Sequence, residues 1–344
     1  MRRMCQPPTP SGEHEFILPP GPPRCPRSRA GCGGRRVCAP VFAGAGETAS
    51  RRKVLVTIVG VAVPRRGPSR TAVLTAAARA LLREQPPPWV LNDYLASELA
   101  GEEGRRLRER LERELPAPYL LSFTRWVGVR ARWPEDLVEE AIGGGVRQYV
   151  ILGAGLDSFA YRRSDLSSRL VVFEVDHPSS QTWKRERLSA LGVELPPNLI
   201  FAPVDFEREA LADGLRAAGF DSRERAVFSW IGVTMYLSLD AIETTLSTIA
   251  RCAPGTRLVL TYNLPRNALQ GMGSEMDAVL APMMADLGEP MVSFFTASEI
   301  AKLLQDHGYQ DIVHFGPEEA TNAYFAGSDA RFAGAQRLVK ATVA

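Results

Sequence analysis

Cysteine is scarce in most of the chain. Of five cysteines in 344 residues, four lie before residue 40, and the fifth is Cys252. A secreted protein stabilised by disulfides would distribute its cysteines through the folded part, so we expect a reduced, cytoplasmic protein. The four early cysteines also lack the closely spaced pairs of zinc sites, and we predict no metal.

The sequence also lacks a long hydrophobic run. Its most apolar uncharged segment, residues 54–63, has ten residues, whereas a membrane helix needs about 20. The segment lies far from the first residue and is not followed by the small-residue cleavage site of a signal peptide. We therefore expect neither export nor a membrane partner.

Acidic residues are rare at the start of the chain and common afterwards. Residues 1–70 contain 13 Lys/Arg and 3 Glu, a charge of +10, whereas residues 71–344 contain 28 Lys/Arg and 36 Asp/Glu, a charge of −8. Nine prolines in residues 1–52 leave too little apolar surface to offset the entropy of ordering, so we predict a disordered basic tail over residues 1–66. The tail lacks interleaved aromatic residues, and we expect no nucleic-acid partner.

From residue 67 onward, apolar residues recur in regular patterns. Helical patterns predict an N-terminal helical cap over residues 67–145, with a helix over about 119–142 that is bent or interrupted near Pro134. After it, short apolar strands alternate with helices, which is typical of an α/β protein with a mostly parallel sheet. The predicted strands are 148–152, 170–175, 199–204, 226–231, 257–262, 311–315 and 336–343. No helix is predicted between the last two, so we expect an antiparallel hairpin at one sheet edge.

Small or acidic residues follow four of these strands. Gly153 and Gly155 follow the first, Asp176 the second and Asp205 the third, while Ser229 to Gly232 end the fourth. In an open α/β sheet, ligands bind beyond the carboxyl ends of the strands, so these residues are expected to form one site. Tight turns and helix caps are the structural alternatives.

The loop at Gly153 does not fit a dinucleotide. The third glycine of the dinucleotide fingerprint is missing, and Asp157 near the helix start would repel a pyrophosphate. A nucleoside fits better, with Asp176 accepting the ribose hydroxyls and Asp205 accepting from the adenine amine beside Phe206. Arg130 or Arg132 could bind a carboxylate of such a cofactor.

The segment 148–157, followed by Tyr161 and Arg162, resembles the signature of the leucine carboxyl methyltransferase-like family. These are class I S-adenosylmethionine-dependent methyltransferases, which include bacterial polyketide O-methyltransferases. Segments 173–178, 204–206 and 229–237 are similar to the next three motifs of the family, and the resemblance covers about residues 69–344.

The resemblance implies a Rossmann-like seven-stranded methyltransferase sheet over residues 146–344, with S-adenosylmethionine as cofactor. It implies that Arg130 holds the methionine carboxylate, that the Gly153–Gly155 turn lies beside the methionine part and that Asp176 binds the ribose. Asp205 and Phe206 would recognise adenine. The carboxyl methyltransferase branch has a cofactor-binding Glu where this chain has Ile231, which weakens any transfer of that branch's protein substrate.

We therefore predict methylation of a carboxyl or hydroxyl oxygen on a small molecule, such as a polyketide or another secondary metabolite. An NAD-dependent oxidoreductase and a non-catalytic protein with the same fold remain alternatives. We name no catalytic base: Tyr236 could face the methyl group or be a buried aromatic residue, and His177 could be a base or structural. The methionine-rich segment 264–295 is either a lid-like insertion over the substrate or a packed helical insertion.

Overall fold

The computed structural model describes residues 68–344 except 207, 329 and 331, so the tail predicted over residues 1–66 lies outside the described residues. Three helices come first: α1 (Arg70–Arg83), α2 (Ala96–Glu114) and α3 (Ala117–Gly143). The strands are β1 (Gln148–Leu152), β2 (Val171–Asp176), β3 (Leu199–Pro203), β4 (Ala226–Trp230), β5 (Arg257–Asn263), β6 (Tyr309–Phe315) and β7 (Gln336–Val343). The later helices are α4 (Phe159–Arg162), α5 (Pro178–Ala190), α6 (Leu211–Ala217), α7 (Leu239–Ile249), α8 (Met272–Asp286), α9 (Ala297–Asp306) and α10 (Pro317–Tyr324).

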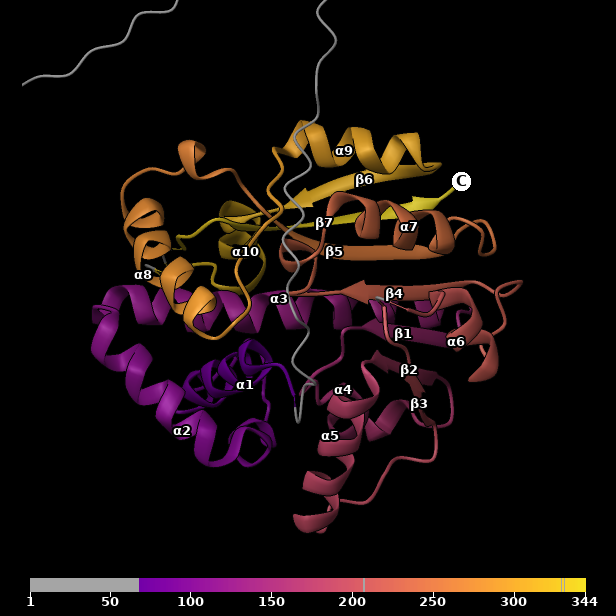
Figure 1. Ribbon diagram of the computed structural model, residues 1–344, viewed down its shortest axis with the longest axis horizontal. Helices are drawn as coiled ribbons and strands as arrows, with labels where there is room; N and C mark the ends of the chain where they lie inside the picture. Colours follow the sequence, from indigo (N-terminus) through magenta and orange to yellow (C-terminus); the bar gives the residue numbers. More distant parts are fainter. Residues whose placement is uncertain (1–67, 207, 329, 331) are drawn as a thin grey trace, which may run out of the picture. The chain divides into compact units, whose positions relative to one another are not determined.

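These strands form one seven-stranded sheet in the order β3-β2-β1-β4-β5-β7-β6 (Figure 1). Strands β1 to β5 pair in parallel, while β7 runs antiparallel between β5 and β6. The chain order reverses between β1 and β4, which is the switch point where open α/β sheets bind ligands. The predicted Rossmann-like, mostly parallel sheet with antiparallel C-terminal strands is confirmed.

The strands were predictable because most of them are buried on both faces. All five residues of β1 and all five of β4 are buried, so both read as continuous apolar runs. The predicted strand bounds agree with the observed ones to within two residues. Strand β2 extends one residue beyond its prediction and ends on Asp176.

One local prediction is wrong, and of the bend or interruption expected near Pro134 the interruption is excluded. Helix α10 lies between β6 and β7, where no helix was expected; it starts at Pro317, and Glu319 accepts a hydrogen bond from the Gly316 N–H. Only eight residues long, it shows too little periodicity to be recognised in the sequence. Helix α3 continues through Pro134 without interruption, held on both sides of the proline by buried Trp133 and Leu137.

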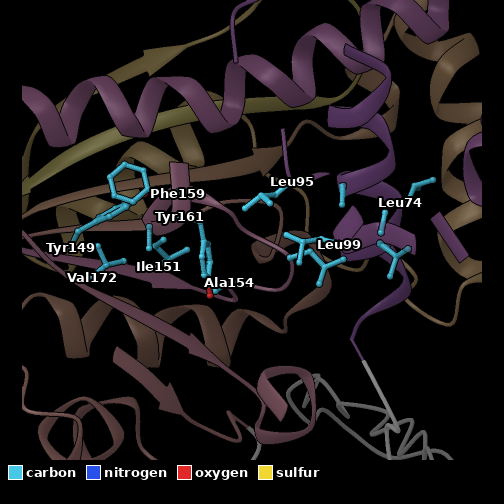
Figure 2. Close-up of a cluster of buried hydrophobic side chains, with 14 of the residues drawn as sticks. Leu74, Leu95, Leu99, Tyr149, Ile151, Ala154, Phe159, Tyr161 and Val172 are labelled. Carbon is cyan, nitrogen blue, oxygen red and sulfur yellow. The ribbon is translucent and has the colours of Figure 1, made fainter. Parts of the chain in front are cut away.

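The helical cap and the sheet share one hydrophobic core. Leu74 of α1 and Leu99 of α2 belong to the same buried cluster as Ile151 of β1 and Phe159 of α4. Figure 2 shows this cluster extending from the cap leucines past Ala154 to the strands. Helix α1 is thereby positioned directly beside the loop that follows β1. No helix within the described part of the chain is long and apolar enough to cross a membrane.

Candidate cofactor and acceptor site

A cavity of about 1080 Å3 lies at the carboxyl ends of β1, β2 and β4. Figure 1 shows α1, α2 and α8 on the side to which the parallel strands point. The cavity wall comes from the loops after β1 to β4, from α1 and α3, and from the segment after α8. All six residues predicted to bind the cofactor line it: Arg130, Gly153, Gly155, Asp176, Asp205 and Phe206.

Helix α3 supplies one of the basic residues that line the cavity, Arg130. Arg130 donates from Nη1 to Gln336 Oε1 at 2.7 Å and from Nη2 to Thr75 Oγ1 at 3.0 Å. Both partners are neutral, and burial lowers the pKa of Arg130 to about 10. A half-buried guanidinium with neutral partners favours an anionic ligand group. Arg132, the alternative from the sequence, instead forms an ion pair with Asp136.

The two glycines after β1 are required by protein packing. Gly153 has φ +66°, and a Cβ there would lie 2.5 Å from Val233 Cγ2. Gly155 has φ +49°, and a Cβ there would lie 2.9 Å from the Cβ of Ala72. The glycines thus allow the loop to approach the segment after β4 and helix α1, in addition to any close approach by a ligand.

Two buried cations hold the next part of this loop. Arg79 of α1 donates to the Leu156 carbonyl at 2.7 Å, and its charge is balanced by Asp93 at 2.6 Å. Lys184 of α5 donates to the Asp157 carbonyl at 2.6 Å. Sequence analysis missed these contacts.

The carboxylate of Asp176 is oriented by backbone donors. Its Oδ2 accepts from the Gly155 N–H at 2.5 Å, and its Oδ1 accepts from the His177 N–H at 2.7 Å. Burial raises the pKa of Asp176, and the two backbone hydrogen bonds oppose that rise. The first bond also links the end of β2 to the glycine loop.

Asp205 and Phe206 lie together at another part of the cavity wall. Asp205 Oδ2 is 3.6 Å from Arg208 Nε and 3.8 Å from His177 Nε2, while Phe206 leaves 36% of its surface exposed. His177 Nδ1 accepts from the Ser179 N–H at 3.2 Å and so caps the start of α5. His177 therefore has a structural role as a helix cap, which is one of the two roles that the sequence suggested for it.

The end of β4 and the segment after it add three further residues to the cavity. Ser229, near the end of β4 itself, accepts a hydrogen bond from the Tyr149 hydroxyl at 2.9 Å. Ile231, just after the strand, packs against the buried cluster that contains Trp126. Tyr236 also lines the cavity. Burial raises the pKa of Tyr236, while the nearby Arg130 charge opposes the rise.

Sequence analysis also missed an acid on the segment that follows α8. Glu289 lines the cavity, and its Oε2 accepts from the Ser69 hydroxyl at 2.7 Å and from the Thr71 hydroxyl. No motif marks these residues, because more than 200 positions separate them in the chain. Helix α8 itself packs into the core through Met283 and Met284.

Two solved structures have a similar fold. A solved structure of a DUF574 family protein from Streptomyces avermitilis aligns with a TM-score of 0.53 and 16% identity, over 79% of this chain and 100% of the other. A structure from Thermobifida fusca described as "a putative methyltransferase" aligns with a TM-score of 0.52 and 18% identity, over 81% and 96% of the two chains. At these identities the likeness shows the methyltransferase fold and nothing finer.

Residues 72–250 match the family model of leucine carboxyl methyltransferase. A Bacillus subtilis (strain 168) protein named "Putative S-adenosyl-L-methionine-dependent methyltransferase YktD" is 30% identical over 285 residues, which cover 75% of this chain and 91% of the relative. A Mycobacterium avium relative, named "Putative S-adenosyl-L-methionine-dependent methyltransferase", is 36% identical over 56% of this chain and 66% of its own length. The chain belongs to the leucine carboxyl methyltransferase family, whose members use S-adenosylmethionine, as the sequence motifs indicated.

Proposed function

We propose that the protein binds S-adenosylmethionine in the cavity at the β1–β4 switch point and methylates a carboxyl or hydroxyl oxygen of a small molecule. The observation that carries the proposal is the convergence of Arg130, the Gly153–Gly155 loop, Asp176 and Asp205 on one cavity. These residues come from four separate elements, yet their chemistry matches the parts of a single ligand.

The donor set fits the cofactor. The guanidinium of Arg130, with its neutral partners, would hold the methionine carboxylate. The carboxylate of Asp176 would accept from the ribose hydroxyls, and Asp205 with the exposed ring of Phe206 would take the adenine. The volume of about 1080 Å3 is slightly above the range of ordinary ligand sites, about 300–1,000 Å3, which leaves room for an acceptor beside the cofactor.

When bound, S-adenosylmethionine supplies an electrophilic methyl group on a positively charged sulfur. The protein's own residues contribute position: Arg130 and Asp176 anchor two ends of the ligand, and such alignment can lower a barrier by several kcal/mol. Val127, Ile231 and Val233 contribute apolar side chains to the cavity wall. A dinucleotide is disfavoured because the Asp157 carboxylate already accepts from the Phe159 N–H at 2.7 Å, where a phosphate would bind.

Calorimetry tests the cofactor assignment. S-Adenosylmethionine and S-adenosylhomocysteine are expected to bind, and NADH is not. Asp176→Ala should weaken both sulfur ligands by about 10-fold or more, because each lost hydrogen bond to a charged group costs about 1.5–3 kcal/mol. Asp213→Ala is the matched control, since Asp213 is exposed and pairs with Arg216. Binding of NADH instead, or equal affinity in Asp176→Ala, would contradict the assignment.

A transfer assay separates an enzyme from a binding protein. The purified protein is incubated with methyl-labelled S-adenosylmethionine and a protein-free small-molecule extract of the source cells. We expect label in the organic-soluble products, with polyketides and other secondary metabolites among the fractions to be resolved. Cofactor binding without label in any fraction would favour a non-catalytic protein that retains the fold.

A further inference from the structure

Three uncharged groups of the protein hold the Arg130 guanidinium. Gln336 Oε1 accepts from Nη1 at 2.7 Å, and Thr75 Oγ1 accepts from Nη2 at 3.0 Å. A Cβ added at Gly232 would lie 3.5, 3.6 and 3.7 Å from Nη2, Cζ and Nη1, so Gly232 lies over the face of the guanidinium plane. The three groups come from β7, α1 and the segment after β4, and separate parts of the fold therefore fix one side chain.

The amide of Gln336 is oriented by two donors of α3. Its Oε1 accepts from Arg130 Nη1 and also from the Trp126 indole Nε1 at 3.3 Å. Trp126 and Arg130 lie four residues apart and so share a face of the helix. Because both groups can only donate, the amide must present its oxygen to them rather than its NH2 group. Gln336 is the first residue of β7 and pairs in register with Asn263, the last residue of β5.

Arg130 differs from the other arginines that line the cavity in the described part of the chain. Arg79 pairs with Asp93 at 2.6 Å, and Arg208 Nε lies 3.6 Å from Asp205 Oδ2. Arg130 has the two neutral hydrogen-bond partners and, among the described residues, forms no ion pair with a carboxylate. Its two hydrogen bonds use two of the five guanidinium N–H donors, so donors remain for a ligand.

The neutrality of Gln336 has a chemical consequence. Glu has nearly the same shape as Gln, and a carboxylate beside a guanidinium forms a charge-assisted pair that is stronger than a neutral hydrogen bond. Such a pair would also compensate the positive charge of Arg130 within the protein. The amide supplies the hydrogen bond that positions the guanidinium and leaves its charge to attract an anion.

We infer, on the basis of the proposed function, that Gln336 is a positioning residue that determines cofactor specificity. It fixes the Arg130 guanidinium without compensating its charge. The cavity therefore favours a cofactor with a carboxylate on its methionine part, such as S-adenosylmethionine, over decarboxylated S-adenosylmethionine. The decarboxylated compound lacks the anion and would bring its ammonium group toward Arg130, where like charges repel each other.

Calorimetry on the full chain tests the inference with S-adenosylhomocysteine, 5′-methylthioadenosine and decarboxylated S-adenosylmethionine. Gln336→Glu should weaken S-adenosylhomocysteine binding by about 10-fold or more, because the introduced carboxylate pairs with Arg130 and repels the ligand carboxylate. 5′-Methylthioadenosine has no amino-acid group and should bind wild type and variant equally. Decarboxylated S-adenosylmethionine should bind the variant more tightly than wild type. Equal weakening of all three ligands would show a general disturbance of the cavity and would overturn the inference.

Gln336→Met separates the charge from the hydrogen bond. It removes the acceptor at nearly constant volume and adds no charge, while Thr75 and Gly232 still hold the guanidinium. S-Adenosylhomocysteine should bind only a few-fold more weakly, and its preference over decarboxylated S-adenosylmethionine should persist. If Gln336→Met loses this preference as steeply as Gln336→Glu, the neutrality of the partner is not what matters, and the inference fails.

A matched control and melting temperatures complete the experiment. Gln305→Glu adds the same charge on exposed α9 and should change the affinity for none of the three ligands. Both Gln336 variants should melt within a few degrees of wild type. If wild type binds neither S-adenosylmethionine nor S-adenosylhomocysteine, the proposed function itself fails. If wild type binds both and Gln336→Glu keeps the wild-type ratio of affinities, only the specificity inference fails.

Discussion

The ammonium group of Lys184 lies 2.6 Å from Glu174 Oε2 in the interior of the protein, with both side chains almost fully buried. Glu174 is in the middle of β2, two residues before Asp176, and Lys184 is on α5. Because Lys184 also donates to the Asp157 carbonyl, this one ion pair links β2 and α5 to the loop that carries the cofactor glycines. Its disruption should therefore affect both folding and cofactor binding.

Lys184→Met is expected to destabilise the protein by about 3–5 kcal/mol, because it leaves the Glu174 carboxylate buried without its cation. Urea unfolding measures this. Lys302→Met, which removes an exposed i,i+4 pair with Asp306, is the matched control and should cost less than about 1 kcal/mol.

The double variant Lys184→Met/Glu174→Leu should recover stability but not affinity for S-adenosylmethionine, because the Asp157 carbonyl still lacks its donor. Full recovery of affinity would show that the pair has no positioning function.

Glu174 should also make stability depend on pH. Burial raises the pKa of Glu174 from 4.5 to about 7, although Lys184 opposes the rise. The folded state then holds this proton more tightly than the unfolded state, so the stabilisation is complete below pH 4.5 and is lost as the pH rises through about 7. The free energy of unfolding of wild type, compared with Glu174→Gln, should fall over that interval. Parallel curves for the two proteins would contradict the prediction.

Gly153→Ala tests whether the glycine loop is constrained by packing as well as by backbone conformation. Gly192 has the same φ of +66°, and a Cβ added there would have no atom within 4 Å, so Gly192→Ala should show the conformational cost alone, about 1–2 kcal/mol. Gly153→Ala adds the contact with Val233 and should cost more, with loss of cofactor binding. Thermal unfolding of the two variants gives the comparison, and equal losses would exclude a packing contribution. Val233→Ala should partly rescue Gly153→Ala.

Arg130→Met should weaken S-adenosylhomocysteine binding by about 10- to 100-fold, the effect of losing a hydrogen bond to a charged group. A ligand without the carboxylate, 5′-methylthioadenosine, should bind wild type and variant equally. Calorimetry with both ligands therefore tests the assigned partner rather than a general disturbance of the cavity. Equal weakening of both ligands would place Arg130 elsewhere than at the carboxylate.

The sheet and the strand-end residues of the candidate site could be predicted from the sequence because they depend on local patterns. Buried parallel strands are continuous apolar runs, and chain connectivity then places Gly153, Asp176 and Asp205 at the same edge. Helix α10 was missed because its apolar pattern is short. The buried position of Glu174 in an apolar strand was a signal for a buried partner, but nothing in the sequence identified Lys184 as that partner.

Local pattern and chain order thus determined the sheet, its strand ends and the family to which the chain belongs. Tertiary packing decided which side chains meet. It placed Arg130 rather than Arg132 in the cavity, pressed Gly155 against Ala72, and brought Glu289 to Thr71 across more than 200 positions. Such contacts depend on how the helical cap packs against the sheet through their shared hydrophobic core. Burial in that packed structure also raises the pKa of Glu174, and the neighbouring residues in the sequence give no sign of this shift.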